Sequence, residues 1–323
     1  MNGEADRYPF GSSAYWRLQL TLVGADAANQ AFHEYGASLS ENEAHTAAHA
    51  FARALYDAEG AVAISYCNEE FAQGCAHEVM AQTISEFGLA SIPELQKNCA
   101  NAFKGGSYFC DHGVGHGLVD YYGYEPPDML EALAYCDAHR AEDKLNGCYT
   151  GVFMEYFLQN VRYSSAVPKP INADQPYDRC VEDKGTARWA CFYTLPLWWH
   201  QIDKHTGEQS EEKILAGMYA RCAAINADID RVACFHGMGH MVAPMAEYEL
   251  DGVLTLCRQI SIPIPDHLLC ISDAAYHILL EKRAPLGLPL CGEYVGAARD
   301  YCVAYATTVV QKSIELPLPA AAQ

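Results

Sequence analysis

Short apolar runs that end on a cysteine recur along the chain. Five of them read AISYC, ALAYC, MYARC, VLTLC and LPLC. About a dozen residues later a second cysteine opens another apolar segment, such as CDHGVGHGLV from Cys110 or CFHGMGHMVA from Cys234. No segment alternates apolar and polar residues over a convincing strand length. The pattern therefore predicts a repeat of helix A, a cysteine, a loop of about ten residues, a second cysteine and helix B.

Local signals place the beginnings of two of these helices. Ser40 and Glu43 have the spacing of a capping box, which opens a helix carrying His45. Pro126 and Pro127 precede the run DMLEALAYC, and proline is favoured in the first turn of a helix. Both signals support helices rather than strands on either side of the cysteines.

The segments after the second cysteines resemble one another, and a cysteine-free copy, EAHTAAHAFA from Glu43, precedes them. Successive copies begin 32 to 43 residues apart, the size of a two-helix repeat. We predict an all-α fold with one domain of about eight hairpins over 25–316, an extended lead-in over 1–24, a loop insertion at 162–178 and a flexible tail at 317–323. A closed α/α toroid with helices B inside is favoured over an open solenoid.

The fourteen cysteines fall into close pairs, with 8 to 13 residues within a pair and 21 to 32 between pairs. The C-x-x-C spacing of metal clusters does not occur. We interpret the pattern as seven sequential disulfides formed in an oxidising compartment. The alternative is a set of buried, reduced cysteines in a cytosolic helical protein. The predicted pairs are Cys67–Cys75, Cys99–Cys110, Cys136–Cys148, Cys180–Cys191, Cys222–Cys234, Cys257–Cys270 and Cys291–Cys302.

In these disulfide-stapled helical hairpins the chain resembles the Sel1-like cysteine-rich repeats. The resemblance concerns architecture alone and implies no function, because the histidine motif described below is not part of that family's pattern. No apolar run approaches the ~20 residues of a transmembrane helix. The segment from Met1 to Gly11 lacks the features of a signal peptide. We expect an extracytoplasmic protein, secreted or periplasmic, with no signal peptide in the chain as given.

The amino-acid composition limits the classes of partner that the protein can bind. Asp and Glu number 41 against 21 Lys and Arg, which gives a formal net charge of -20. So acidic a surface repels phosphate backbones and anionic lipids, so we expect no nucleic-acid partner. Half of the residues are hydrophobic and 19% are charged, which is typical of a folded core rather than a disordered chain.

Histidines recur at the second and sixth positions after the cysteine that opens helix B. They form three i,i+4 pairs, two of them within the string C-x-H-G-x-G-H. On a helix such a pair lies on one face and can chelate copper, iron or zinc. The glycines indicate either close approach by a neighbour or a loop, and a loop would remove this geometry. A purely structural role in packing is the alternative. The candidate metal ligands are His45, His49, His77, His112, His116, His236 and His240.

Acidic and aromatic side chains flank the same positions. Glu78, Asp111 and Glu155 are the candidate catalytic residues, and Asp273 and His277 lie at related positions. Near a metal the acids could be ligands, partners of the imidazoles or general bases. They could also be acids favoured by the start of a helix. Several tyrosines could line a cavity for a small molecule or a glycan, or simply pack: Tyr121, Tyr122, Tyr124, Tyr156, Tyr193 and Tyr276.

Three functions are compatible with these features. The first is an extracytoplasmic metal-binding protein, or a metalloenzyme, with copper, iron or zinc in a histidine-lined central site. The second is a metal-independent toroid glycan hydrolase or lyase that uses paired carboxylates such as Glu78 and Glu155. The third is a non-catalytic, disulfide-rigidified repeat scaffold for protein binding. The sequence leaves open the metal, the substrate, the oligomeric state and whether the protein is an enzyme.

Overall fold

The computed structural model of the chain describes residues 10–68, 70–103, 107–139, 146–159, 168–172, 174–206, 210–258, 264–282 and 287–308. These residues form α-helices and short 3-10 helices, and no strand occurs among them. The predicted all-α fold is therefore confirmed. The chain divides into two compact units. Unit 1 contains the described residues up to 139 and unit 2 those from 146 onward.

Unit 1 begins with a long helix and continues with short connections between helices. In chain order its helices are α1 (Ser13–Gly36), α2 (Glu41–Glu59), η2 (Gly60–Tyr66), η3 (Phe71–Gln73), α3 (Gly74–Phe87), η4 (Leu89–Ser91), α4 (Ile92–Ala102), α5 (Ser107–Tyr122) and α6 (Pro126–Ala138). Both predicted helix starts are confirmed, because the Ser40–Glu43 capping box opens α2 and Pro126 is the first residue of α6.

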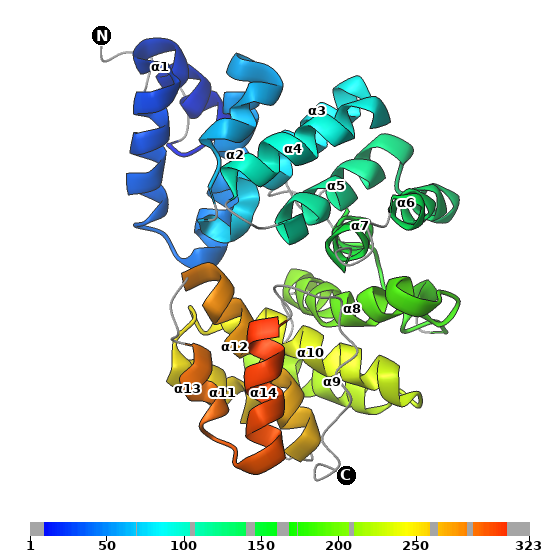
Figure 1. Cartoon of the computed structure of the whole chain (residues 1–323). Helices are drawn as coiled ribbons and strands as arrows, with labels where there is room; N and C mark the ends of the chain where they lie inside the picture. Colours follow the sequence, from blue (N-terminus) through cyan, green and yellow to red (C-terminus); the bar gives the residue numbers. More distant parts are fainter. Residues whose placement is uncertain are drawn as a thin grey trace. The chain divides into compact units, whose positions relative to one another are not determined.

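Unit 2 repeats the same alternation of longer and shorter helices (Figure 1). In chain order its helices are α7 (Asn146–Leu158), η5 (Asp178–Val181), α8 (Gly185–Thr206), α9 (Glu211–Ala223), α10 (Asp228–Met245), α11 (Leu250–Arg258), α12 (Ile264–Lys282), α13 (Leu288–Cys291) and α14 (Gly296–Thr308).

Within each unit, the helices that carry the repeated segments, including the cysteine-free copy on α2, pack against one another in chain order. In unit 1, α2 packs on α3 and α3 on α5. In unit 2 the same order runs through α7, α8, α10, α12 and α14. These helices are covered on several sides, so they are apolar around most of their circumference. In α3, for example, every residue from Gly74 to Ala81 is buried. Five of the seven candidate histidines are buried inside the units, and His45 and His240 are partly exposed.

The C-x-H-G-x-G-H strings are helical, in α5 and in α10, so the i,i+4 spacing of their histidines holds. Their glycines allow neighbouring helices to approach closely. A Cβ at Gly113 would lie 2.8 Å from the sulfur of Met80 on α3. A Cβ at Gly239 would lie 2.7 Å from the Cβ of Asp273 on α12. Close helix contact, rather than a loop, explains these glycines.

All fourteen cysteines are bonded, and the seven predicted disulfides are confirmed. Each closes a loop of about a dozen residues and contributes ~3 kcal/mol to stability in the chain-entropy model. Cys136 and Cys148 are disulfide-bonded. The others are Cys67–Cys75, Cys99–Cys110, Cys180–Cys191, Cys222–Cys234, Cys257–Cys270 and Cys291–Cys302.

Helix A varies more than the sequence pattern indicates. The first cysteines of five pairs lie in α4, α6, α9, α11 and α13. Cys67 and Cys180, in contrast, lie at 3-10 helices, η2 and η5. Gly60 ends α2 with a positive φ of 64° and leaves only seven residues before Cys67. Such a short segment is typical of a 3-10 connection rather than a full α-helix.

The expected extended lead-in is in part helical. Residues 13–24 form the first half of α1, which Ser12 caps by accepting a hydrogen bond from the backbone N–H of Tyr15 at 3.1 Å. Trp16 is buried against Phe32 and Phe51, and this long-range contact stabilises the segment. Gly24 interrupts the helix with a φ of 81°, at the predicted boundary.

The other predicted boundaries are tested only in part. In the loop insertion, the described residues 168–172 and 174–177 contain no helix. The predicted tail at 317–323 lies outside the described residues. A single repeat domain and its closure into a toroid stay predictions. Among the described helices, none is both long and apolar enough to cross a membrane.

Candidate metal centre

Five of the seven candidate histidines come together in unit 1. His45 and His49 lie on α2, His77 on α3, and His112 and His116 on α5. The ring of His77 lies 6.1 Å and 6.2 Å from those of His45 and His49, and 4.9 Å and 5.1 Å from those of His112 and His116, measured between centroids. The single histidine of α3 thus stands between the two i,i+4 pairs.

The five imidazoles form two groups of three that share His77. In each group, one potential ligand atom of every residue lies within 4.8 Å of the others. His45, His49 and His77 form the outer triad, in which His45 is partly exposed. His77, His112 and His116 form the inner triad, in which all three side chains are buried. Either triad could hold a metal ion.

The pair on α2 has the orientation of metal-bound histidines. Nδ1 of His45 donates a hydrogen bond to the backbone carbonyl of Phe71 at 2.9 Å. Nδ1 of His49 lies 3.4 Å from a carboxylate oxygen of Glu78. Both partners are acceptors, so each Nδ1 carries the proton and each Nε2 carries a lone pair. Second partners of this kind are what orient metal-ligating histidines.

The two Nε2 atoms of this pair face each other at 3.2 Å. Nε2 of His112 and Nε2 of His116 are 3.1 Å apart on α5. Two nitrogens bound to one ion at ~2.0–2.1 Å lie about 2.9 Å apart at a right angle and about 3.4 Å apart at the tetrahedral angle. Both separations fall in this interval. Facing lone pairs repel unless a cation, a proton or a metal ion, lies between them.

His77 is 5% exposed, and its Nε2 is buried and makes no hydrogen bond. A buried polar atom left without a partner is costly, and metal coordination is one way to satisfy it. The pKa of His77 is lowered well below its usual range, first by burial and then by the four neighbouring imidazoles. His77 is therefore neutral at physiological pH, the state that a metal ligand requires.

Glu78 and Asp111 lie next to the triads but face other partners. Glu78 is 1% exposed and contacts His49, accepts a hydrogen bond from Gln82 at 3.1 Å and lies 3.7 Å from Arg53. Asp111 is buried and accepts a hydrogen bond from Gln96 at 2.8 Å. Neither carboxylate belongs to the candidate metal groups among the described residues. Glu78 instead orients the imidazole of His49.

The remaining candidate pair, on α10 of unit 2, has a different environment. His236 stacks on Tyr305 at 4.0 Å between centroids, and its Nε2 lies 3.0 Å from the hydroxyl of Tyr301. His240 stacks on His277 at 4.3 Å. Within the described residues neither belongs to a group that could hold a metal ion. The same pattern thus has tyrosines and one imidazole, His277, as neighbours in unit 2, and the imidazole of His77 as neighbour in unit 1.

Asp273 is the centre of this second cluster. Its carboxylate accepts hydrogen bonds from Tyr305 at 2.7 Å and from Tyr193 at 3.2 Å, and it lies 3.4 Å from Nε2 of His277. Burial alone would raise the pKa of Asp273, but the hydrogen bond and charge of His277 keep it below its usual value. Burial lowers the pKa of His236 to about 4. The cluster is a network of one carboxylate, tyrosines and imidazoles, in which Nδ1 of His236 is buried and makes no hydrogen bond.

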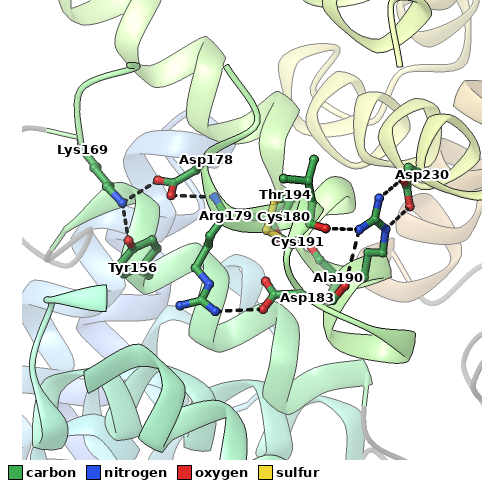
Figure 2. The surroundings of a disulfide bond; sticks show 12 residues. Tyr156, Lys169, Asp178, Arg179, Cys180, Asp183, Ala190, Cys191, Thr194 and Asp230 are labelled. Atoms are coloured by element: carbon green, nitrogen blue, oxygen red, sulfur yellow. Dashed lines mark hydrogen bonds and ion pairs between the residues drawn. A yellow bond between two sulfur atoms is a disulfide. The ribbon is translucent and has the colours of Figure 1, made fainter. Parts of the chain in front are cut away.

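The remaining candidates are placed as follows. Glu155 is fully buried on α7, so a polysaccharide does not reach it in this conformation. Tyr156 is buried next to it, and Figure 2 shows Lys169 between the Tyr156 hydroxyl and Asp178. Tyr276 is buried, whereas Tyr121 is 45% exposed. Tyr122 and Tyr124 are half-buried.

Two kinds of contributor escaped the sequence pattern. The carbonyl of Phe71 orients His45, but any residue supplies a carbonyl, so no side-chain motif marks it. Tyr301 and Tyr305 contact His236 from α14, whose segment contains no histidine. Their positions around the last second cysteine, Cys302, are the only signal that could have indicated them.

Comparison with known proteins finds no match: no family model fits the chain, and no curated protein and no solved structure is similar to it.

Proposed function

We propose that this chain is a metal-binding protein of an oxidising, extracytoplasmic compartment, with its centre in the histidine cluster of unit 1. One observation carries the proposal. Both Nδ1 atoms of His45 and His49 face acceptors, so their Nε2 lone pairs point at each other across 3.2 Å. A metal ion relieves this repulsion and uses the geometry of a chelating pair.

The donor set favours copper or zinc. Imidazole suits copper, zinc, iron and nickel, whereas magnesium and calcium prefer oxygen ligands. Thiolates are not offered, because every cysteine is disulfide-bonded. Non-haem iron sites typically include a carboxylate ligand, and neither triad has one. Copper and zinc are therefore preferred over iron for an all-imidazole site.

The disulfides support the proposed compartment. Seven of them fit an extracellular protein, because cytosolic thiols are kept reduced. Disulfide formation also removes the thiolates as metal ligands and leaves imidazole nitrogens in the cluster of unit 1. Disulfide formation and metal binding by the histidines are thus compatible with one oxidising compartment.

A metalloenzyme is the more specific form of the proposal. Catalytic zinc sites keep three protein ligands and leave a position for water, and each triad offers three imidazoles. The outer triad is the better candidate, because His45 is partly exposed whereas the inner triad is buried. When bound, the metal would supply an activated water or, for copper, redox chemistry. Glu78 would keep the proton of His49 on Nδ1 and would fix the orientation of its ring.

Metal analysis tests the proposal. The full chain, with its disulfides intact, is stripped with a chelator, loaded with Zn²⁺ or with Cu²⁺, desalted and measured by elemental analysis. We expect stoichiometric metal in the wild type, and loss of metal from the outer triad in the double variant His45→Ala with His49→Ala. His139→Ala is the matched control, because His139 is exposed and its ring stacks on Tyr135, away from both triads among the described residues. A wild-type protein that is folded and retains neither metal refutes the proposed function.

A further inference from the structure

We propose that the histidine cluster binds two metal ions, one in each triad, with the imidazole of His77 as a bridge between them. This inference rests on the proposed function of the cluster as a metal centre and adds the number of ions and the role of His77. It is carried by three features of the cluster: the separation of its ligand atoms, its two chelating pairs, and the position of His77.

The separation of the ligand atoms argues against a single ion held by all five histidines. Two ligand atoms on the same ion at ~2.1 Å cannot be more than about 4.2 Å apart. The five histidines do not form a single group even at the wider limit of 4.8 Å. They form two groups of three that share His77. One ion can therefore use one triad and leaves the other pair without a metal.

Each triad has its own chelating edge. The pair on α2 and the pair on α5 have Nε2 separations of 3.2 Å and 3.1 Å, and both distances match two nitrogens on one ion. Helix α3 packs against both α2 and α5, so His77 reaches both pairs from a single position. A second ion would fit between Nε2 of His112 and Nε2 of His116, as the first would between Nε2 of His45 and Nε2 of His49.

His77 has the features required of a bridge. Its Nε2 is buried and makes no hydrogen bond, and its ring lies close to both pairs. A ring that binds two ions uses both of its nitrogens, so the remaining N–H proton leaves to solvent and the ring becomes an imidazolate. Its negative charge then lies between the two cations and offsets their mutual repulsion. Glu78, which contacts His49, adds negative charge beside the cluster.

Copper loading combined with electron paramagnetic resonance tests the inference. The full chain is loaded with Cu²⁺ in air and desalted, and copper per chain is compared with the spin count of the doubly integrated signal. An imidazolate bridge couples two Cu²⁺ ions antiferromagnetically. We expect about two copper ions per wild-type chain and a low-temperature spin count well below the copper content.

Variants locate each ion. The double variant His112→Gln with His116→Gln should leave one copper per chain, in the outer triad, with a full spin count. The double variant His45→Gln with His49→Gln should leave one copper per chain in the inner triad, also with a full spin count. His77→Gln should restore a spin count equal to the copper content, because the bridge is lost. His139→Ala should behave like the wild type. If one pair variant fails to fold, the other pair variant and the wild-type measurement still decide.

The outcomes separate the two claims. One copper per wild-type chain, with a full spin count, overturns the two-ion inference and leaves the proposed function standing. Two coppers with a full, uncoupled spin count overturn the bridge. A folded wild type that retains no copper or zinc overturns both the inference and the proposed function.

Discussion

Replacement of Glu78 by glutamine tests how much a buried carboxylate contributes to metal affinity. Glu78 is 1% exposed, and its two oxygens face Nδ1 of His49 at 3.4 Å and Arg53 at 3.7 Å. Glutamine has nearly the same shape and can still accept a hydrogen bond from His49. The change therefore removes a charge and leaves the packing in place.

Two estimates bracket the expected effect. Loss of the partner of a metal-bound histidine typically costs 10- to 100-fold in affinity, about 1.4–2.8 kcal/mol. A negative charge about 7 Å from a divalent ion contributes about 5 kcal/mol at an effective dielectric constant of ~20. The second value is an upper limit, because Arg53 lies beside the carboxylate and opposes its charge. We expect zinc affinity to fall by about 30-fold.

The affinity is measured by competition between the metal-free protein and a chromogenic zinc chelator at neutral pH. Circular dichroism shows whether the variant keeps its helices. Glu86→Gln is the matched control, because Glu86 lies two turns further along α3 and accepts a hydrogen bond from Tyr56 at 2.8 Å instead. Zinc affinity of Glu78→Gln within twofold of the wild type, in a natively helical protein, refutes the assigned role of Glu78.

Three further predictions concern stability. Cys222→Ala with Cys234→Ala removes a disulfide whose cysteines are 12 residues apart, and should lower the free energy of unfolding by ~3 kcal/mol in urea titrations; an unchanged midpoint contradicts the entropic argument. Gly239→Ala forces a Cβ to 2.7 Å from the Cβ of Asp273 and should cost ~1–3 kcal/mol, whereas Gly217→Ala, with nothing within 4 Å, should stabilise α9 by ~0.5–1 kcal/mol. Equal effects of the two alanines in thermal denaturation would refute the close-packing argument. The pKa of buried His236 is about 4 in the folded protein and ~6.5 in the unfolded chain. Its contribution to the free energy of unfolding is therefore fully present above pH ~6.5 and is lost as the pH falls toward about 4. The total loss is about 3 kcal/mol. His236→Gln should therefore flatten the decline of the unfolding free energy between pH 6.5 and 4 in the metal-free protein, and an unchanged slope would contradict the assignment.

Much of the local structure could be read from the sequence. The spacing of the cysteines predicts seven short-range disulfides, which form because each pair is joined by a short loop. The capping box at Ser40 and the prolines at 126–127 predict two helix starts correctly. The i,i+4 pairs depend only on the helical turn, so they hold on α2 and on α5. The helix over residues 13–24 was not predicted, because the packing of Trp16 against Phe51 stabilises it and no local sequence pattern shows that contact.

The sequence by itself therefore determined the local structure: an all-α repeat, its disulfide-bonded cysteines, and imidazoles one helical turn apart. Only the tertiary structure decided which imidazoles meet. The C-x-H-G-x-G-H string around His112 lies against His77, and the string of the same pattern around His236 lies against Tyr305 and Asp273. The physical reason is range. Helical spacing is fixed by neighbouring residues, whereas the environment of a side chain depends on which residues the adjacent helix presents, and these come from another repeat.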